Sequence, residues 1–111
     1  MGRIDVLNRL FEVIESRRRE RPDGSYVVGL LDGGLDAIAA KLREEGEEVI
    51  EAARAGDTHH LAREVADLLF HTWVLMAHGG ITPDDACRVL EERFGVGGLV
   101  EKAARGGPDG G

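Results

Sequence analysis

Apolar side chains recur every three or four positions along most of this chain, which is the spacing of one face of an α-helix. The first such stretch covers residues 3–19, and its apolar positions are Ile4, Leu7, Leu10, Phe11 and Ile14. No stretch of alternating apolar and polar residues indicates a strand. The pattern therefore predicts an all-α protein, a bundle of four to five helices.

Turn residues divide the first half of the chain. Pro22-Asp23-Gly24 is expected to end the first helix, because proline and glycine interrupt helices. Ser25 is a good helix cap and predicts a short helix to about residue 31. Gly33-Gly34 forms a second break, after which a helix is expected over residues 35–55 and ends at a glycine.

The second half contains two more predicted helices. One covers residues 58–78, and its apolar side chains occupy nearly the whole circumference, so we expect it to be buried. The other begins at Thr82-Pro83, a cap followed by proline at the first helical position, and ends at Gly95. A domain over residues 1–105 is expected, with one more turn within residues 97–105 and a disordered glycine-rich tail over residues 106–111.

Composition narrows the classes of function. The chain has 111 residues, enough for one domain, and a net charge of −7, which argues against nucleic acid as a partner. The single cysteine, Cys87, excludes an internal disulfide and fits a reducing cytosol. No apolar stretch reads as a signal peptide or as a membrane span, so we expect a cytoplasmic protein without membrane contact.

Acidic residues interrupt the apolar faces of two predicted helices. Glu45 lies between Leu42 and Val49 on the apolar face of residues 35–55, while Glu48 lies at its edge. On residues 58–78 the polar side chains form one stripe, made of His60, Glu64, Asp67 and His71. Buried carboxylates without partners are costly, so these acids are expected to have a cation or an ion pair.

Side by side, these two helices would gather several carboxylates, namely Glu44, Glu45, Glu48, Glu64 and Asp67. Clustered carboxylate oxygens suit Mg²⁺ or Mn²⁺, and such sites commonly act on phosphates. A buried ion pair with Lys41 or Arg63 is the structural alternative. Glu47 and Glu51 point away from the apolar face and are read as solvated.

The spacing of these acids resembles a known signature. Glu44-Glu45-x-x-Glu48, then fifteen residues, then Glu64-x-x-Asp67 is similar to the motif of the MazG-like all-α nucleotide pyrophosphohydrolases. Within this superfamily, three further segments resemble the phosphoribosyl-ATP pyrophosphohydrolases: Ser25-Tyr26-Val27, residues 64–71 and residues 101–105. The resemblance covers residues 4–105 and departs at Gly29 and Gly97, where the family often has lysine and serine.

This resemblance implies the second step of histidine biosynthesis, the hydrolysis of phosphoribosyl-ATP to phosphoribosyl-AMP and pyrophosphate. It implies Mg²⁺, or Mn²⁺, as cofactor. The apolar circumference of residues 58–78 separately predicts a homodimer, in which two chains would pack these helices together and complete the bundle. The metal ligands that the resemblance implies are Glu45, Glu48, Glu64 and Asp67, which with Glu44 form the catalytic set. The substrate-binding residues it implies are Lys41, Tyr26, Lys102 and Arg105.

Three other functions remain open from the sequence. A house-cleaning enzyme of the same superfamily, acting on deoxynucleoside triphosphates, would share the acidic motif. A di-iron bundle would need Glu-x-x-His, and neither Glu45 nor Glu64 is followed by histidine at that spacing. A non-enzymatic dimerisation bundle would leave the acids solvated, and its stability would be indifferent to Mg²⁺.

Overall fold

The computed structural model describes residues 2–95, and within them every regular element is helical. A short 3₁₀ turn, η1 (Arg3–Asp5), precedes four α-helices, and their bounds are α1 (Val6–Glu20), α2 (Tyr26–Ala55), α3 (Thr58–Gly79) and α4 (Pro83–Phe94). This confirms the all-α prediction. The chain divides into two compact units, Met1–Ile81 with the first three helices and Thr82–Gly111 with α4, and each is described by itself.

The first helix ends where the turn residues predicted. Arg21 takes the left-handed conformation with φ 52°, and its N–H donates to the carbonyl of Arg17. The Arg21 guanidinium also donates to both carboxylate oxygens of Asp32, at 2.8 and 2.9 Å. This ion pair ties the loop after α1 to the first part of α2. The helix was predicted to start at residue 3. Residues 3–5 instead form the 3₁₀ turn, and regular α-helix begins at Val6.

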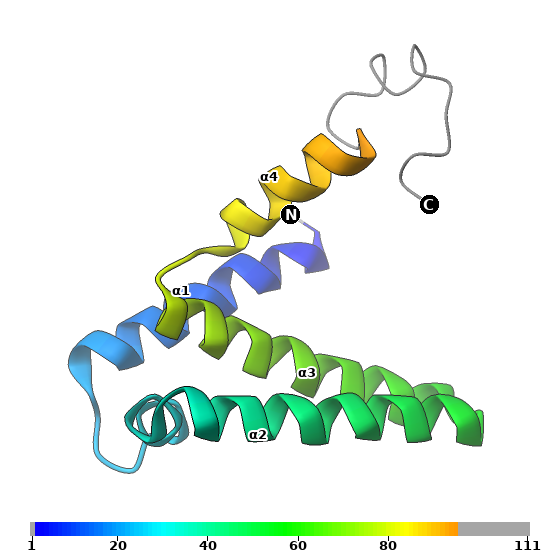
Figure 1. The fold of residues 1–111 in the computed structure, drawn as a ribbon, viewed down its shortest axis with the longest axis horizontal. Coiled ribbons are helices and arrows are strands. Elements are labelled where there is room, and N and C mark those ends of the chain that lie inside the picture. The colour runs from blue at the N-terminus through cyan, green and yellow to red at the C-terminus, as the bar shows by residue number, and fades with distance from the viewer. Residues whose placement is uncertain (1, 96–111) are drawn as a thin grey trace. The chain divides into compact units, whose positions relative to one another are not determined.

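Helix α2 contains a sharp kink at the predicted glycine break. Ser25 caps the helix by accepting a hydrogen bond from the Val28 N–H at 3.3 Å. Gly34 then has φ 74° and ψ −166°, a combination that is essentially restricted to glycine. The predicted break is therefore confirmed: α2 consists of two helical segments that meet at Gly34, and Figure 1 shows the first segment turned out of line with the second.

Helices α2 and α3 form an antiparallel pair. Gly56 ends α2 in the left-handed conformation, and Asp57 caps α3 by accepting from the His60 N–H at 3.0 Å. Because the connection is so short, the two helices lie side by side in Figure 1.

Helix α1 packs against α3, and the Trp73 indole N–H donates to the Leu7 carbonyl at 2.8 Å. Apolar side chains of all three helices meet in one buried core, made of Phe11, Ile14, Val27, Leu30, Ile38, Val74 and Ala77.

The expectation that α3 is buried on nearly every side is wrong for the single chain. Only His71, Val74 and Ala77 of this helix are buried, and all three lie in its C-terminal half. Val65 in the N-terminal half is 37% exposed. The physical reason is that the N-terminal half of α3 has α2 beside it, whereas α1 covers only the C-terminal half (Figure 1).

In the second unit, α4 begins with the predicted cap. The Thr82 hydroxyl accepts from the Asp85 N–H at 3.3 Å, and the Asp85 carboxylate accepts from the Thr82 N–H at 2.8 Å. This reciprocal pair is a capping box, with Pro83 at the first helical position. The helix ends at Gly95 with φ 65°. The predictions for residues 97–105 and 106–111, and the domain bound at 105, lie outside the described residues.

Between residues 2 and 95, the structure has no helix of the length and hydropathy needed to cross a bilayer.

Candidate metal centre

Three carboxylates from two helices meet at the interface of the antiparallel pair. Glu45 and Glu48 lie one turn apart on α2, and Glu64 faces them from α3. One oxygen of each residue lies within 4.8 Å of the others. We call these residues the three-glutamate cluster. Their separation suits oxygen ligands that converge on one divalent cation.

Glu45 occupies the inward position that the apolar spacing predicted. The residue is only 6% exposed. Its Oε1 lies 3.8 Å from the Lys41 Nζ, so part of the anticipated ion pair is present. Its Oε2 is buried and has no hydrogen-bond partner among residues 2–95. One ammonium therefore leaves half of this carboxylate unsatisfied.

Glu64 repeats this arrangement from the opposite helix. The His60 ring donates to Glu64 Oε2 at 2.9 Å, while Oε1 is buried and unpartnered within the described part of the chain. Buried acceptors without partners cost free energy, and a cation between the two helices would satisfy both orphaned oxygens. The donor set therefore fits a hard divalent metal ion such as Mg²⁺ or Mn²⁺.

The carboxylates also perturb one another. The neighbouring Glu64 carboxylate, desolvation and repulsion from Glu45 and Glu44 together raise the pKa of Glu48 to about 7. The proximity of Glu48, with the His60 and Arg63 side chains, lowers the pKa of Glu64. The crowded carboxylates thus resist carrying their full negative charge near neutral pH, and a divalent cation bound between them would relieve this repulsion.

Two of the predicted acids lie outside this cluster. Asp67 is exposed, and its expected burial is wrong. Residue 67 is three positions after Glu64, which rotates its side chain by about 60° around the helix, towards the open side of α3. Glu44 is also exposed, and its carboxylate accepts from the Lys41 ammonium at 3.4 Å. This agrees with the outer-edge position that its place on the helix predicted.

Lys41 lies beside the cluster. Partial burial would lower the pKa of Lys41, but nearby Tyr26, Glu44 and Glu45 outweigh it and raise that pKa. Lys41 therefore stays cationic and has two carboxylates within 4 Å. A cationic side chain next to a metal-binding cluster is suited to contact an anionic substrate.

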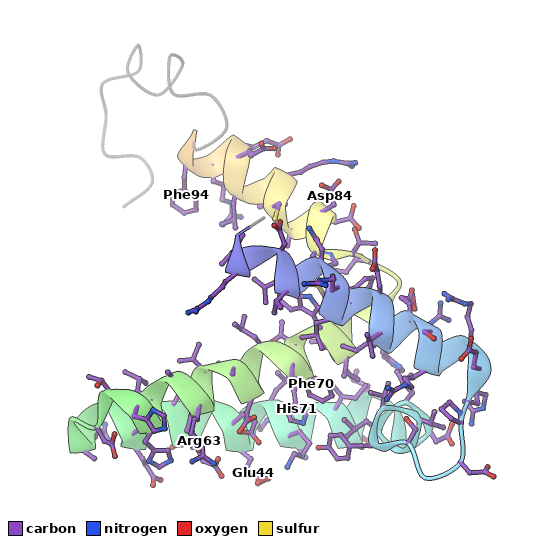
Figure 2. The ribbon with its side chains drawn as sticks, turned by 180° about the vertical axis from the view of Figure 1, so that it is seen from behind. Glu44, Arg63, Phe70, His71, Asp84 and Phe94 are labelled. Atoms are coloured by element: carbon purple, nitrogen blue, oxygen red, sulfur yellow. The ribbon has the colours of Figure 1, made fainter. Side chains whose placement is uncertain are left out.

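The sequence reasoning missed one contact of Tyr26. Its hydroxyl lies 2.8 Å from Nε2 of His71, and Nδ1 of His71 lies 2.8 Å from the backbone carbonyl of Asp67. In Figure 2, His71 and Phe70 lie between α3 and α2, and Glu44 projects from the outer side of α2. The only available signal was that His71 belongs to the polar stripe of α3, and nothing in that stripe identifies a tyrosine 45 residues earlier as its partner.

The proposed substrate contacts Lys102 and Arg105 lie outside the described residues.

Comparison with known proteins places the chain in a family. The family model described as phosphoribosyl-ATP pyrophosphohydrolase matches residues 7–94, which extend from the second residue of α1 to the end of α4. A relative from Methylococcus capsulatus, called phosphoribosyl-ATP pyrophosphatase, is 48% identical over 92% of this chain and 97% of its own length. Relatives of the same name from Chromobacterium violaceum and Geobacter sulfurreducens are 46% and 44% identical, over 91% and 93% of this chain and 94% and 95% of their own lengths. The chain thus belongs to the phosphoribosyl-ATP pyrophosphohydrolase family.

Proposed function

We propose that this protein hydrolyses phosphoribosyl-ATP to phosphoribosyl-AMP and pyrophosphate, the second step of histidine biosynthesis, with a divalent cation as cofactor. Family membership supports the reaction. The observation that supports a divalent cation as cofactor is the three-glutamate cluster, in which two buried carboxylate oxygens lack partners among the described residues.

In this proposal Glu45, Glu48 and Glu64 hold Mg²⁺ or Mn²⁺. Asp67, one turn beyond Glu64 on an exposed part of α3, is a further carboxylate for the same ion or a second one. A bound divalent ion supplies charge neutralisation for the phosphates and lowers the pKa of a coordinated water.

The remaining residues position the substrate and move a proton. Lys41 would contact a phosphate oxygen as a point charge, because its ammonium is already held at the edge of the cluster by two carboxylates. Glu44 is exposed and would accept a proton from the attacking water. Water adds to phosphorus, the bond to the bridging oxygen breaks, and pyrophosphate leaves. Positioning and charge neutralisation are the main requirements of this reaction.

We also propose that two copies of the chain associate. Apolar side chains of α2 and α3 are exposed in the single chain, among them Leu35, Ile50 and Val65. A second copy packed on these helices would remove these side chains from water and complete a helix bundle, and symmetric dimers are the commonest oligomers of soluble proteins.

The test of the reaction is pyrophosphate release from phosphoribosyl-ATP, measured beside ATP and a panel of deoxynucleoside triphosphates, with Mg²⁺ and with EDTA. The proposal expects release from phosphoribosyl-ATP that EDTA abolishes. Release mainly from deoxynucleotides would keep the metal centre but assign the protein to nucleotide-pool cleansing. Activity that persists in EDTA would contradict the proposal that the reaction requires a divalent cation.

A further inference from the structure

Tyr26, at the start of α2, is held in place by two side chains of α3. Its ring centroid lies 6.0 Å from that of Phe70 with an interplanar angle of 21°, and 5.7 Å from that of His71 at 89°. Phe70 and His71 are themselves edge to face, at 5.0 Å. Contacts of this kind fix a ring in one orientation. Even so, Tyr26 is 52% exposed, so part of this fixed side chain is accessible to solvent.

The hydrogen bonds of His71 determine which way the phenol donates. His71 is 5% exposed, and a backbone carbonyl lies 2.8 Å from its Nδ1. A carbonyl only accepts hydrogen bonds, so Nδ1 must carry the hydrogen. The other hydrogen-bond partner of the ring within residues 2–95 is the Tyr26 phenol, and no carboxylate is among these partners. In the Nδ1–H tautomer Nε2 has no hydrogen and accepts from the Tyr26 hydroxyl.

This leaves acceptor capacity on the oxygen of a half-exposed Tyr26. Its only hydrogen is committed to His71, and its remaining lone pair is available to an incoming group. His71, which holds the phenol, lies seven residues beyond Glu64 on α3, about 10 Å along the helix axis. The phenol is therefore within reach of the nucleoside part of a nucleotide whose phosphates lie at the three-glutamate cluster.

Phosphate oxygens are acceptors at neutral pH and gain nothing from a second acceptor. The groups of a nucleotide that can donate to the Tyr26 oxygen belong to its nucleoside part, as hydroxyl O–H or amino N–H. We infer that His71 is a positioning residue that fixes Tyr26 as a hydrogen-bond acceptor for the nucleoside part of the substrate. The inference rests on the proposed function, and it assigns phosphate binding to Lys41 and the cluster.

The experiment is a double-mutant cycle on phosphoribosyl-ATP hydrolysis, with KM and kcat measured separately. Tyr26→Phe removes the acceptor and should raise KM by roughly three- to tenfold, the value of one hydrogen bond, with kcat changed less than about twofold. His71→Phe should produce a similar rise, and the double variant should be no worse than either single variant. Multiplicative effects on KM would overturn the inference.

Rescue by a conservative variant separates positioning from packing. In His71→Gln the amide oxygen extends towards the place of Nε2 and can still accept a hydrogen bond from the phenol. The KM of this variant should therefore lie close to that of the wild type. The stabilisation of the protein by Mg²⁺ should be the same in all variants, because neither residue belongs to the cluster. A His71→Gln variant as impaired as His71→Phe would show that the ring acts by shape alone and would contradict the inference.

The tautomer is checked without activity. Long-range ¹H–¹⁵N correlation of the wild-type protein should show the His71 hydrogen on Nδ1, and a hydrogen on Nε2 would overturn the assigned roles. Absence of turnover by the wild type would refute the proposed function and, with it, the nucleotide partner of Tyr26. Turnover with an unchanged KM in Tyr26→Phe would refute the inference alone.

Discussion

Glu45 is the buried carboxylate on which the proposed metal site depends most. It lies between apolar residues on α2, it is 6% exposed, and one of its oxygens has no partner among residues 2–95. The Lys41 ammonium offsets the charge of this carboxylate only in part, because Nζ lies 3.8 Å from Oε1. In the metal-free protein such a residue costs stability, because a buried charge is incompletely solvated. Its presence is best explained by a bound cation.

Glu45→Gln should therefore separate function from folding. The substitution keeps the shape and removes the charge, so the free energy of unfolding without metal should be unchanged or raised, by about 1 kcal/mol at most. Pyrophosphate release should be lost. Glu47→Gln, at an exposed position of the same helix, is the matched control and should retain activity. Activity of the Glu45 variant near that of the wild type would contradict the metal assignment.

At the residue scale, the sequence predicted which side chain lies in the middle of a buried helix face. It did not predict which parts of a helix surface other helices cover. Glu45 was placed correctly because apolar neighbours surround it on the helix. Asp67 was expected to be buried because α3 is apolar around most of its circumference, yet whether that surface is covered depends on packing partners that the sequence does not specify. The Tyr26–His71 contact depends on the kink of α2 and on distant pairing, so no local pattern indicates it.

At the scale of elements, the kink at Gly34 places the segment that carries Tyr26. Its φ of 74° and ψ of −166° are strained for any residue with a Cβ, although the space around it is open. Gly34→Ala should lower the free energy of unfolding by roughly 1–3 kcal/mol, as measured by urea denaturation. It should also raise KM for the substrate, because the segment bearing Tyr26 would shift.

Gly29→Ala is the control for this change. Gly29 lies on the same helix, is exposed, and a Cβ there meets no atom within 4 Å. Alanine has the higher helix propensity, so this variant should gain up to about 1 kcal/mol of stability. Equal stability changes in the two variants would show that the backbone at Gly34 carries no special requirement.

The capping box predicts how α4 responds to pH. Hydrogen bonds from the backbone N–H and hydroxyl of Thr82 lower the pKa of Asp85, aided by Arg88. A carboxyl whose pKa is lower in the folded state stabilises that state above its unfolded pKa, near 3.9, and loses this contribution as pH falls through the folded value. The helical ¹³C shifts of α4 should therefore weaken below about pH 4.

Asp85→Asn provides the comparison for this titration. The amide cannot ionise, so the helical shifts of the variant should be weaker at pH 7 and flatter across the acid range. Asp84, exposed and paired with Arg88, is not part of the capping box, and Asp84→Asn should keep the wild-type profile. A wild-type helix that is unchanged down to pH 2 would contradict the capping role.

The elements were largely predictable because each end has a local cause. Three residues were recognisable as caps or stops and act as such in the structure, namely Ser25, Gly56 and Thr82. The break predicted at Gly33-Gly34 is present as well, because Gly34 has non-helical φ and ψ, but the sequence did not indicate how sharply the two segments of α2 turn there.

At the scale of the whole molecule, the apolar positions exposed on α2 and α3 predict a dimer. Light scattering at micromolar concentration should give about twice the chain mass of 12.0 kDa. Val65→Glu would place a charge on the exposed apolar surface of α3 and should shift the mass towards that of one chain. Val13→Glu, at an exposed position of α1, is the matched control. A wild-type mass of one chain would contradict the pairing.

The central claim is that the cluster of Glu45, Glu48 and Glu64 binds the divalent cation. The most direct measurement is Mn²⁺ binding followed by electron paramagnetic resonance, on the wild type, Glu64→Gln and Glu47→Gln. The wild type and Glu47→Gln should bind Mn²⁺ alike, and Mg²⁺ should compete. Binding by Glu64→Gln should be at least tenfold weaker, the effect of about 1.4 kcal/mol. Equal affinity of Glu64→Gln and the wild type would show that the cation, if bound, lies elsewhere.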